Sequence, residues 1–511
     1  MNKTKSKSKI KLNPIMTLVI LIGLTIVLSG ILSLFRVSVT YNEVNSVTNT
    51  YDKTLVSVEN MFSLSGLKYI FSSTVSNFVA FTPLSMLIII LIGIGVMEKS
   101  GFLKTTFTLI TKNAQKKTIT FAIVLISILF SLAGELGYVI MIPLSALVFL
   151  YGRRNPLIGI VASFAGLTCG TGLNVIFTSV DSSLMSITLN ASHILDNNYT
   201  MSVWAYFLIM LVAAILVSIL ITFITERFMI NEVEKYEFKE EKKEFKLTKR
   251  ELRGLLFAGT VGLVYVLFFI YNIIPGVPFG GNLLDYKQVL YIDKLFSPDS
   301  FFSQGFVFII TMLFVLLGLF YGLGAKTIKN NNDFCDDLGH SLDEIGKPIV
   351  LILLASVLIN VFKKSNIGTV IVGALSNLVG GSAFTGIPLL ILFFLVVVIA
   401  TMVLPGSVNK WTVLAGNCVP IMMNAGFSPE FIQVIFRFGE CVTYGITPIM
   451  AYYVIYLAYL EKYQQGDEPI TLFRSLKYQR KYSYMVGILL LVILILWYIV
   501  GLPLGSGAPT I

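Results

Sequence analysis

The stretch at residues 404–448 reads LPGSVNKWTVLAGNCVPIMMNAGFSPEFIQVIFRFGECVTYGITP. It interrupts the membrane-length apolar run at 384–403 with Pro405 and Gly406, and then carries Lys410, Arg437 and Glu440. Non-helical backbone at membrane depth persists only when it is buried in protein or lines a water-filled cavity. Ionisable residues there are costly and usually functional. We therefore predict that this stretch holds the working site, although each residue alone would also fit an exposed loop between two spans.

The composition places the rest of the chain in a membrane. The 511 residues are 55% hydrophobic and only 13% charged, which is typical of a polytopic membrane protein. The net charge of +10 comes from short Lys and Arg runs between apolar segments, as in cytoplasmic loops, so we predict no nucleic-acid function. Four isolated cysteines lack CxxC spacing and predict neither a disulfide nor a metal site.

The charge pattern also orients the chain. Five lysines precede the first apolar run, at 15–35, which predicts a cytoplasmic N-terminus and a retained first span instead of a cleaved signal peptide. The same reasoning makes 36–81 a polar loop on the outer side. It also predicts single spans at 83–107 and 349–379, the second interrupted by Lys363 and Lys364.

Two segments fit re-entrant hairpins. Residues 118–151 have basic residues at both ends but are interrupted by glycines around Glu135, so a hairpin with its tip facing a cavity explains them better than two short spans. Residues 384–423 fit a second hairpin, entering from the opposite side, with its tip at 405–410.

Two further segments fit broken spans, at 157–181 and 429–460. In the first, the closely spaced Gly166, Gly170 and Gly172 predict either a helix break or close helix packing. If the helix is broken, its free carbonyls together with Thr171 and Asn174 would offer oxygen ligands to Na⁺. Asp181 is expected to end this span, with an outer loop after it. In the second, Thr443 and Pro448 occupy the comparable position.

The order span, hairpin, broken span, span occurs twice with opposite orientation, as in inverted-topology transporters. The predicted fold is an all-α polytopic membrane protein with about nine transmembrane helices plus two opposed re-entrant hairpins in an inverted-topology repeat. Its expected parts are a cytoplasmic tail (1–14), a first span and outer loop (15–82), the first repeat (83–225), a charged loop with two connecting spans (226–347), the second repeat (348–502) and a C-terminal tail (503–511).

Sites in such transporters lie where hairpin tips meet broken helices. Ser407, Asn409 and the amides after Gly406 are candidates for binding an anionic group at a helix N-terminus. Trp411 offers a face for an aromatic ring, and Arg437 a bidentate donor for a carboxylate. Arg437 and Glu440 are also spaced as a plain i,i+3 ion pair. The core acids Asp181, Glu135 and Glu440 are candidate proton carriers.

The chain resembles the AbgT family of p-aminobenzoyl-glutamate and antimetabolite transporters. The resemblance rests on FTPLSMLIIILIGIGVMEKSGFL (81–103), GYVIMIPLSALVF (137–149), FAGLTCGTGLNVI followed by Asp181, SNIGT (365–369) and the stretch from Asn409 to Pro448. It implies a homodimer of nine spans and two hairpins in a bacterial plasma membrane. It assigns functional positions to Asp181, Trp411, Pro429, Arg437 and Pro448. This chain departs from the family pattern at Val408, Glu440 and Tyr444.

The sequence therefore predicts a secondary transporter for p-aminobenzoyl-glutamate-like aromatic carboxylates, driven by H⁺ or Na⁺ and lacking any cofactor. The alternatives are proton-driven export of sulfonamide-type antimetabolites and dicarboxylate transport on the same scaffold. No GxxxxGK[ST] motif indicates ATP hydrolysis, and no HExxH or GxSxG motif indicates an enzyme. The predicted ion-coupling residues are Asp181, Asn174, Thr171, Glu135 and Thr443, with a possible Na⁺ at Asn174 and Thr171.

Overall fold

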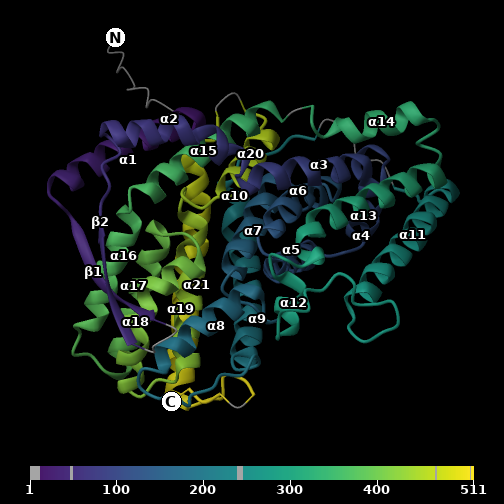
Figure 1. Cartoon of the computed structure of the whole chain (residues 1–511). Helices are drawn as coiled ribbons and strands as arrows, with labels where there is room; N and C mark the ends of the chain where they lie inside the picture. Colours follow the sequence, from purple (N-terminus) through teal and green to yellow (C-terminus); the bar gives the residue numbers. More distant parts are fainter. Residues whose placement is uncertain are drawn as a thin grey trace, which may run out of the picture.

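The computed structural model describes residues 12–45, 50–238, 245–343, 345–466, 469–506 and 508–510. Within these residues the chain is mostly helical, with one two-stranded sheet (Figure 1). Most of the predicted tail at 1–14 lies outside the described residues, so the side on which the N-terminus lies stays a prediction.

Nine helices in the described part of the chain are long and apolar enough to cross a membrane. Two of the nine are first arms of the predicted hairpins, and the other seven coincide with predicted spans. The predicted broken spans are not among the nine, because their halves have 15 residues or fewer. The predicted number of nine is confirmed, but two hairpin arms stand in the place of the two predicted broken spans. The seven are α1 (Pro14–Leu34), α3 (Thr82–Lys99), α9 (Phe207–Ile224), α11 (Lys249–Ile273), α13 (Phe301–Ala325), α15 (Gly346–Lys364) and α21 (Leu472–Val500).

Both hairpins form as a helix, a glycine turn and a second helix. The first consists of α5 (Lys116–Phe130), the short η1 (Ser131–Ala133) and α6 (Leu136–Tyr151), and the second of α17 (Gly386–Val403) and α18 (Ser407–Asn424). Each turns at a glycine with positive φ, 60° at Gly134 and 97° at Gly406, where a side chain would be strained. The α-helical part of the first arm, α5, has 15 residues and rises about 22 Å; only together with η1 does it reach the 18 residues of the candidate span counted above. Lys410 lies inside α18 and not in the predicted tip.

Both predicted broken spans are interrupted. The first is α7 (Pro156–Gly170) followed by α8 (Ser179–Ser192), and the second is α19 (Pro429–Thr443), the short η3 (Tyr444–Ile446) and α20 (Tyr453–Tyr463). The expectation that Asp181 ends a span before an outer loop is wrong. Thr178 caps a new helix and Asp181 is its third residue, in a reciprocal capping box.

The hairpins exchange partners between the two repeats. The first arm of each hairpin packs on the first half of its own broken helix, α5 on α7 and α17 on α19. The second arm also reaches the second half of the other repeat's broken helix: α18 packs on α8, and α6, which packs mainly on α7, also contacts α20. In Figure 1, α7, α19 and α21 run side by side through the middle of the molecule. This reciprocal packing is what an inverted repeat requires, and it brings the helix breaks together.

The first predicted span of each repeat is two helices instead of one. After α3, Gly101 (φ 90°) leads into α4 (Phe102–Lys112), and after α15, Asn366 (φ 58°) leads into α16 (Ile367–Gly380). Lys363 and Lys364 are therefore the last two residues of α15, and both are exposed. The ammonium of Lys364 lies 2.9 Å from the carboxylate of Glu59.

The segment at 36–81, predicted as a polar loop, has regular structure instead, and it holds the two-stranded sheet of an otherwise helical chain. Strands β1 (Ser38–Asn45) and β2 (Thr50–Ser57) pair antiparallel, and α2 (Leu64–Val79) leads into α3. Val39 and Tyr41 alternate inward and β1 packs on α16 and α18. A Cβ on Gly416 of α18 would lie 2.2 Å from the Asn42 carbonyl oxygen, so glycine lets the strand pack this closely.

Helices α11 and α13 pack on each other and reach the rest of the protein mainly through α3, on the right of Figure 1. Of the short elements, α12 (Tyr291–Phe296) packs on α13 and α14 (Asn331–His340) packs on α3, whereas η2 (Thr225–Met229) and α10 (Ile230–Glu232) continue α9. The elements that position the predicted site all belong to the two repeats.

Candidate substrate and ion site

Four ionisable side chains meet where α8, α18 and α19 converge. Lys410, Arg437, Glu440 and Asp181 are each at most 1% exposed. Lys410 Nζ lies 2.8 Å from Glu440 Oε1, Arg437 Nη1 lies 2.9 Å from Glu440 Oε2, and Arg437 Nη2 lies 3.4 Å from Asp181 Oδ1. We call these four residues the central cluster. With all four ionised, two cations face two carboxylates and the cluster has no net charge.

Helix ends place three of the four side chains. Lys410 is in the first turn of α18, just after the Gly406 turn, and Asp181 is in the first turn of α8. A carboxylate in the first turn of a helix is stabilised by the helix dipole. Asp181 Oδ2 also accepts hydrogen bonds from the Thr178 amide at 3.0 Å and from Asn174 Nδ2 at 2.8 Å. Glu440 lies near the end of α19, one turn after Arg437.

Arg437 does more than neutralise Glu440. Its Nη1 donates to Ser407 Oγ at 3.2 Å, and its Nη2 donates to the Thr171 carbonyl oxygen at 2.5 Å. The guanidinium thus joins the second hairpin, the first helix break and α8. A substrate carboxylate that binds Nη1 or Nη2 in this conformation has to replace one of these partners, whereas the buried Nε of Arg437 has no hydrogen-bond partner among the described residues.

Trp411 follows Lys410 of the central cluster, and both its indole nitrogen and its ring already have partners. It is fully buried, its Nε1 donates to Thr188 Oγ1 at 2.9 Å, and the Thr188 hydroxyl lies 2.7 Å from Gln433 Oε1. Its ring centroid is 4.5 Å from that of Phe436 and 6.3 Å from that of Phe393. In this conformation Trp411 connects α18 to α8 and α19, and a substrate ring has to displace a neighbour to reach it.

The other predicted substrate residues are spread out. Asn409 is exposed on the first turn of α18, close to Gly406. Pro429 begins α19, eight residues from Arg437 and therefore about 12 Å along the helix. Pro448 lies between η3 and α20 and is partly exposed. The Thr443 hydroxyl donates to the Val398 carbonyl at 2.7 Å, so it fastens α19 to α17.

The predicted Na⁺ ligands are only partly suitable. The Thr171 carbonyl already accepts from Arg437, whose positive charge repels a cation there. The Asn174 Oδ1 atom is buried and has no hydrogen-bond partner among the described residues, so it is open to a donor or an ion. Of the two, only Asn174 fits a cation in this conformation.

The glycines before Asn174 favour close packing. A Cβ on Gly170 would lie 2.8 Å from backbone atoms of Ile128 in α5. A Cβ on Gly172 would lie 2.1 Å from the Arg437 carbonyl oxygen. The first helix break can lie against α19 because residue 172 has no side chain.

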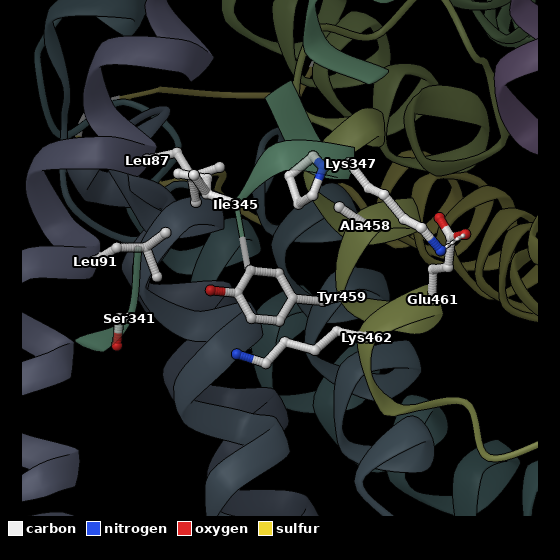
Figure 2. Close-up of a pocket in the computed structure, with 10 residues that line it drawn as sticks. Leu87, Leu91, Ser341, Ile345, Lys347, Ala458, Tyr459, Glu461 and Lys462 are labelled. Atoms are coloured by element: carbon white, nitrogen blue, oxygen red, sulfur yellow. Dashed lines mark ion pairs between the residues drawn. The ribbon is translucent and has the colours of Figure 1, made fainter. Parts of the chain in front are cut away.

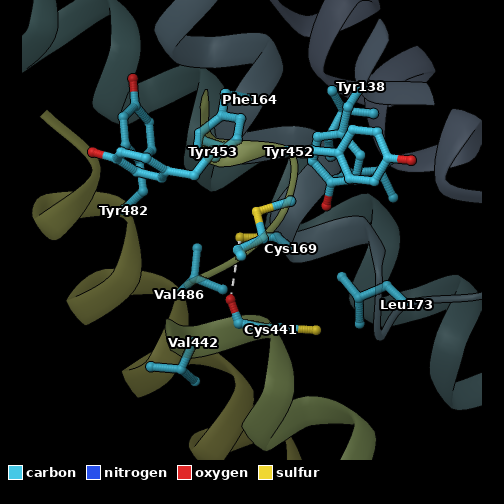
Figure 3. Close-up of a cluster of buried hydrophobic side chains, with 14 of the residues drawn as sticks. Tyr138, Phe164, Cys169, Leu173, Cys441, Val442, Tyr452, Tyr453, Tyr482 and Val486 are labelled. Carbon is cyan, nitrogen blue, oxygen red and sulfur yellow. Dashed lines mark hydrogen bonds between the residues drawn. The ribbon is translucent and has the colours of Figure 1, made fainter. Parts of the chain in front are cut away.

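Glu135 connects the first hairpin tip to the second helix break. Its carboxylate accepts from the Tyr452 hydroxyl at 2.7 Å, and the rings of Tyr452 and Tyr138 stack with centroids 5.4 Å apart. The hydroxyls of Tyr138 and Thr171 are 3.0 Å apart. Figure 3 shows the two tyrosines side by side near Cys169 and Cys441, where the two broken helices meet. Thr171 therefore contacts both groups: its hydroxyl lies beside Tyr138, and its carbonyl oxygen accepts from Arg437 of the central cluster.

The sequence prediction noticed the charge of Lys410 but gave it no role in the site, and it missed Thr188 and Gln433. A lysine in the first turn after a hairpin glycine, in an otherwise apolar helix, is the signal that identifies Lys410. Thr188 had no comparable signal, because the segment that carries it was expected to be a loop.

The model of the AbgT putative transporter family matches residues 8–511. The chain belongs to the AbgT family. The p-aminobenzoyl-glutamate transport protein of Escherichia coli (strain K12) is 26% identical over 495 residues, covering 97% of this AbgT protein and 94% of the relative. The family assignment makes the chain a multi-pass membrane transporter.

Two solved structures are similar to this AbgT protein over nearly its whole length. The YdaH transporter of Alcanivorax borkumensis, described as having an unusual topology, is 23% identical, with 97% of this chain and 100% of that chain covered and a TM-score of 0.48. MtrF of Neisseria gonorrhoeae, described as illuminating a class of antimetabolite efflux pumps, is 28% identical, with 98% of each chain covered and a TM-score of 0.49.

Proposed function

We propose that this AbgT protein is a secondary transporter of p-aminobenzoyl-glutamate-like aromatic carboxylates, driven by an H⁺ or Na⁺ gradient. The observation that carries the proposal is the buried, charge-balanced central cluster at the meeting point of the two repeats. The E. coli relative, which is named for p-aminobenzoyl-glutamate transport, supports the substrate class. The resemblance also leads us to propose a homodimer.

Charge balance supplies the coupling. A carboxylate that enters the neutral cluster and binds Arg437 leaves it with one excess negative charge, which is costly in a site from which water is excluded. A proton on Asp181 or Glu440, or a cation at Asn174 Oδ1, restores neutrality. The anion and the cation therefore bind best together, which is the condition for symport.

The test is uptake of labelled p-aminobenzoyl-glutamate into proteoliposomes under imposed H⁺ or Na⁺ gradients. We expect the wild type to accumulate the solute with one of the gradients. Asp181→Asn keeps a capping side chain but removes the charge, leaving the cluster at +1 without any cation bound. This variant should exchange solute in counterflow yet lose gradient-driven accumulation.

The matched control is Glu430→Gln, which removes a buried acid from the same helix, α19, outside the cluster; there Glu430 accepts from the Tyr199 hydroxyl at 2.6 Å. It should retain accumulation. Folded protein without flux under any gradient refutes the substrate class, and sulfonamide and dicarboxylate uptake measured in parallel decides between the alternatives. Unchanged accumulation by Asp181→Asn refutes the coupling.

A further inference from the structure

Two cavities outside the central cluster differ in their charge. Figure 2 shows the smaller one, of about 220 Å³, between α3, α15 and α20. There the Lys347 ammonium lies 3.6 Å from the Glu461 carboxylate, so this cation already has a counter-ion. The larger cavity, of about 570 Å³, lies where the turn between α3 and α4, the start of α11 and the end of α13 meet. These helices are on the right of Figure 1.

Three cationic side chains line the larger cavity without an acid as partner. Lys104 is in the first turn of α4, and Lys249 and Arg250 are the first two residues of α11. All three are exposed, and none of their side chains forms an ion pair or hydrogen bond within the part of the chain that the structure describes. The one acid in the lining, Glu251, already accepts from the amide and the hydroxyl of Thr248, both at 2.7 Å. Three cations against one acid leave an excess of two positive charges.

A pair of buried hydroxyls at the same cavity has one hydrogen to spare. Thr105 and Tyr321 line the cavity, are 3% and 2% exposed, and have hydroxyl oxygens 2.6 Å apart. Each hydroxyl carries one hydrogen, and the bond between them uses only one of the two. Neither hydroxyl has another hydrogen bond among the described residues. Because buried donors nearly always have an acceptor, the second hydrogen requires one in the cavity.

The start of α11 favours an anion and places it at the membrane surface. The free amides in the first turn of a helix carry partial positive charge and bind phosphate-like groups. The 25 residues of α11 rise about 38 Å, more than the ~30 Å hydrocarbon core, so its basic first turn reaches the level of the lipid headgroups. Just after this turn, Leu252 and Leu256 are 47% and 62% exposed and offer apolar surface to acyl chains.

We propose that this cavity binds the headgroup of an acidic phospholipid. The phosphate lies among Lys104, Lys249 and Arg250, and the Thr105–Tyr321 pair donates its spare hydrogen to a headgroup oxygen. The acyl chains follow the exposed apolar face of α11. Basic pockets between transmembrane helices bind acidic headgroups in this way, and the volume lies within the roughly 300–1,000 Å³ of ligand sites. A soluble phosphate would satisfy the cations but leave the apolar face uncovered, which favours the lipid.

The test is native mass spectrometry of the purified full-length protein, titrated in detergent with phosphatidylglycerol or phosphatidylcholine. The wild type should bind phosphatidylglycerol more tightly. Lys104→Gln/Lys249→Gln should weaken that binding about 25-fold, because each cation near an acidic lipid contributes a factor of about five. Lys347→Gln is the matched control, since it changes an exposed lysine in the first turn of another membrane-length helix, but one paired with Glu461. It should bind phosphatidylglycerol like the wild type.

The hydroxyl pair is tested separately. Thr105→Val/Tyr321→Phe keeps both shapes but removes both hydroxyls, and it should weaken phosphatidylglycerol binding about fivefold to tenfold, the value of one hydrogen bond. Equal binding of the two lipids by the wild type, or phosphatidylglycerol binding unchanged in the double-lysine variant, overturns the site. Inorganic phosphate titrated in parallel identifies the source. Phosphate binding that only the double-lysine variant loses, with phosphatidylglycerol bound equally by both proteins, overturns the lipid as the occupant.

Discussion

Removing two opposite charges from the central cluster should destabilise the protein less than the sum of the two single removals. Lys410 and Glu440 are both fully buried and 2.8 Å apart, and breaking one side of a buried ion pair costs about 3–5 kcal/mol. Lys410→Met leaves Glu440 with Arg437 as a partner at 2.9 Å, so the cost should be near the lower limit. Glu440→Gln leaves Lys410 without an acid and Arg437 with only Asp181, at 3.4 Å, so the cost should be near the upper limit.

The double variant Lys410→Met/Glu440→Gln returns the cluster to zero net charge. Its free energy of unfolding should therefore exceed the value expected from adding the two single losses, by about 2–3 kcal/mol of coupling. The assay is unfolding in mixed micelles with increasing dodecyl sulfate, followed by tryptophan fluorescence, for the wild type and the three variants. Lys287→Met, at an exposed pair, is the control and should change stability by about 0–1 kcal/mol. Additive losses, or single losses below about 1 kcal/mol, would show that the four charges do not act as a balanced set.

Two further predictions use the same unfolding assay. Gly172→Ala should lower the free energy of unfolding by about 1–3 kcal/mol or more and abolish transport, because the new methyl carbon would lie 2.1 Å from the Arg437 carbonyl oxygen. The control is Gly259→Ala in α11, which has nothing within 4 Å and should stabilise the protein by about 0.5–1 kcal/mol. A mild effect at residue 172 would mean that the first helix break does not pack against α19 as described. Arg154→Met should lower the free energy of unfolding by about 3–5 kcal/mol, because Arg154 and Glu226 form an ion pair at 2.5 Å with side chains that are only 7% and 11% exposed. A loss no larger than that of Lys287→Met would contradict the burial of this pair.

Much of the architecture followed from the sequence because its signals are local. Glycines at 134 and 406 within apolar runs, and basic residues on both sides of 118–151, were enough to predict the two hairpins, and the closely spaced glycines at 166, 170 and 172 indicated the first broken helix. The errors have local causes as well. Gly101 and Asn366 end α3 and α15 through a left-handed residue, which hydropathy does not register. The strands at 38–57 are polar enough to resemble a loop, and only packing on α16 and α18 makes them a sheet.

The residues of the candidate site also fall into two groups, those that the sequence indicated and those that only the structure identified. Arg437, Glu440 and Asp181 were identified because charges in apolar segments stand out one by one, and the family resemblance points to Asp181 and Arg437 as well. Lys410, Thr188 and Gln433 acquire their roles only through partners far away in sequence. Thr443 shows the opposite case, since a threonine beside a helix break suggested an ion ligand but its hydroxyl is bound to the Val398 carbonyl.

The sequence by itself determined that this protein is a helical membrane transporter with two turns and two breaks inside its apolar segments, because hydrophobic length, glycine and charge act over one or two helical turns. The tertiary structure decided which charges pair. It placed α8 of the first repeat against α18 of the second, and this exchange brings Asp181 within 3.4 Å of Arg437 and opposes two buried cations with two buried acids. Such balance depends on distances between segments more than 200 residues apart, and no local pattern encodes them.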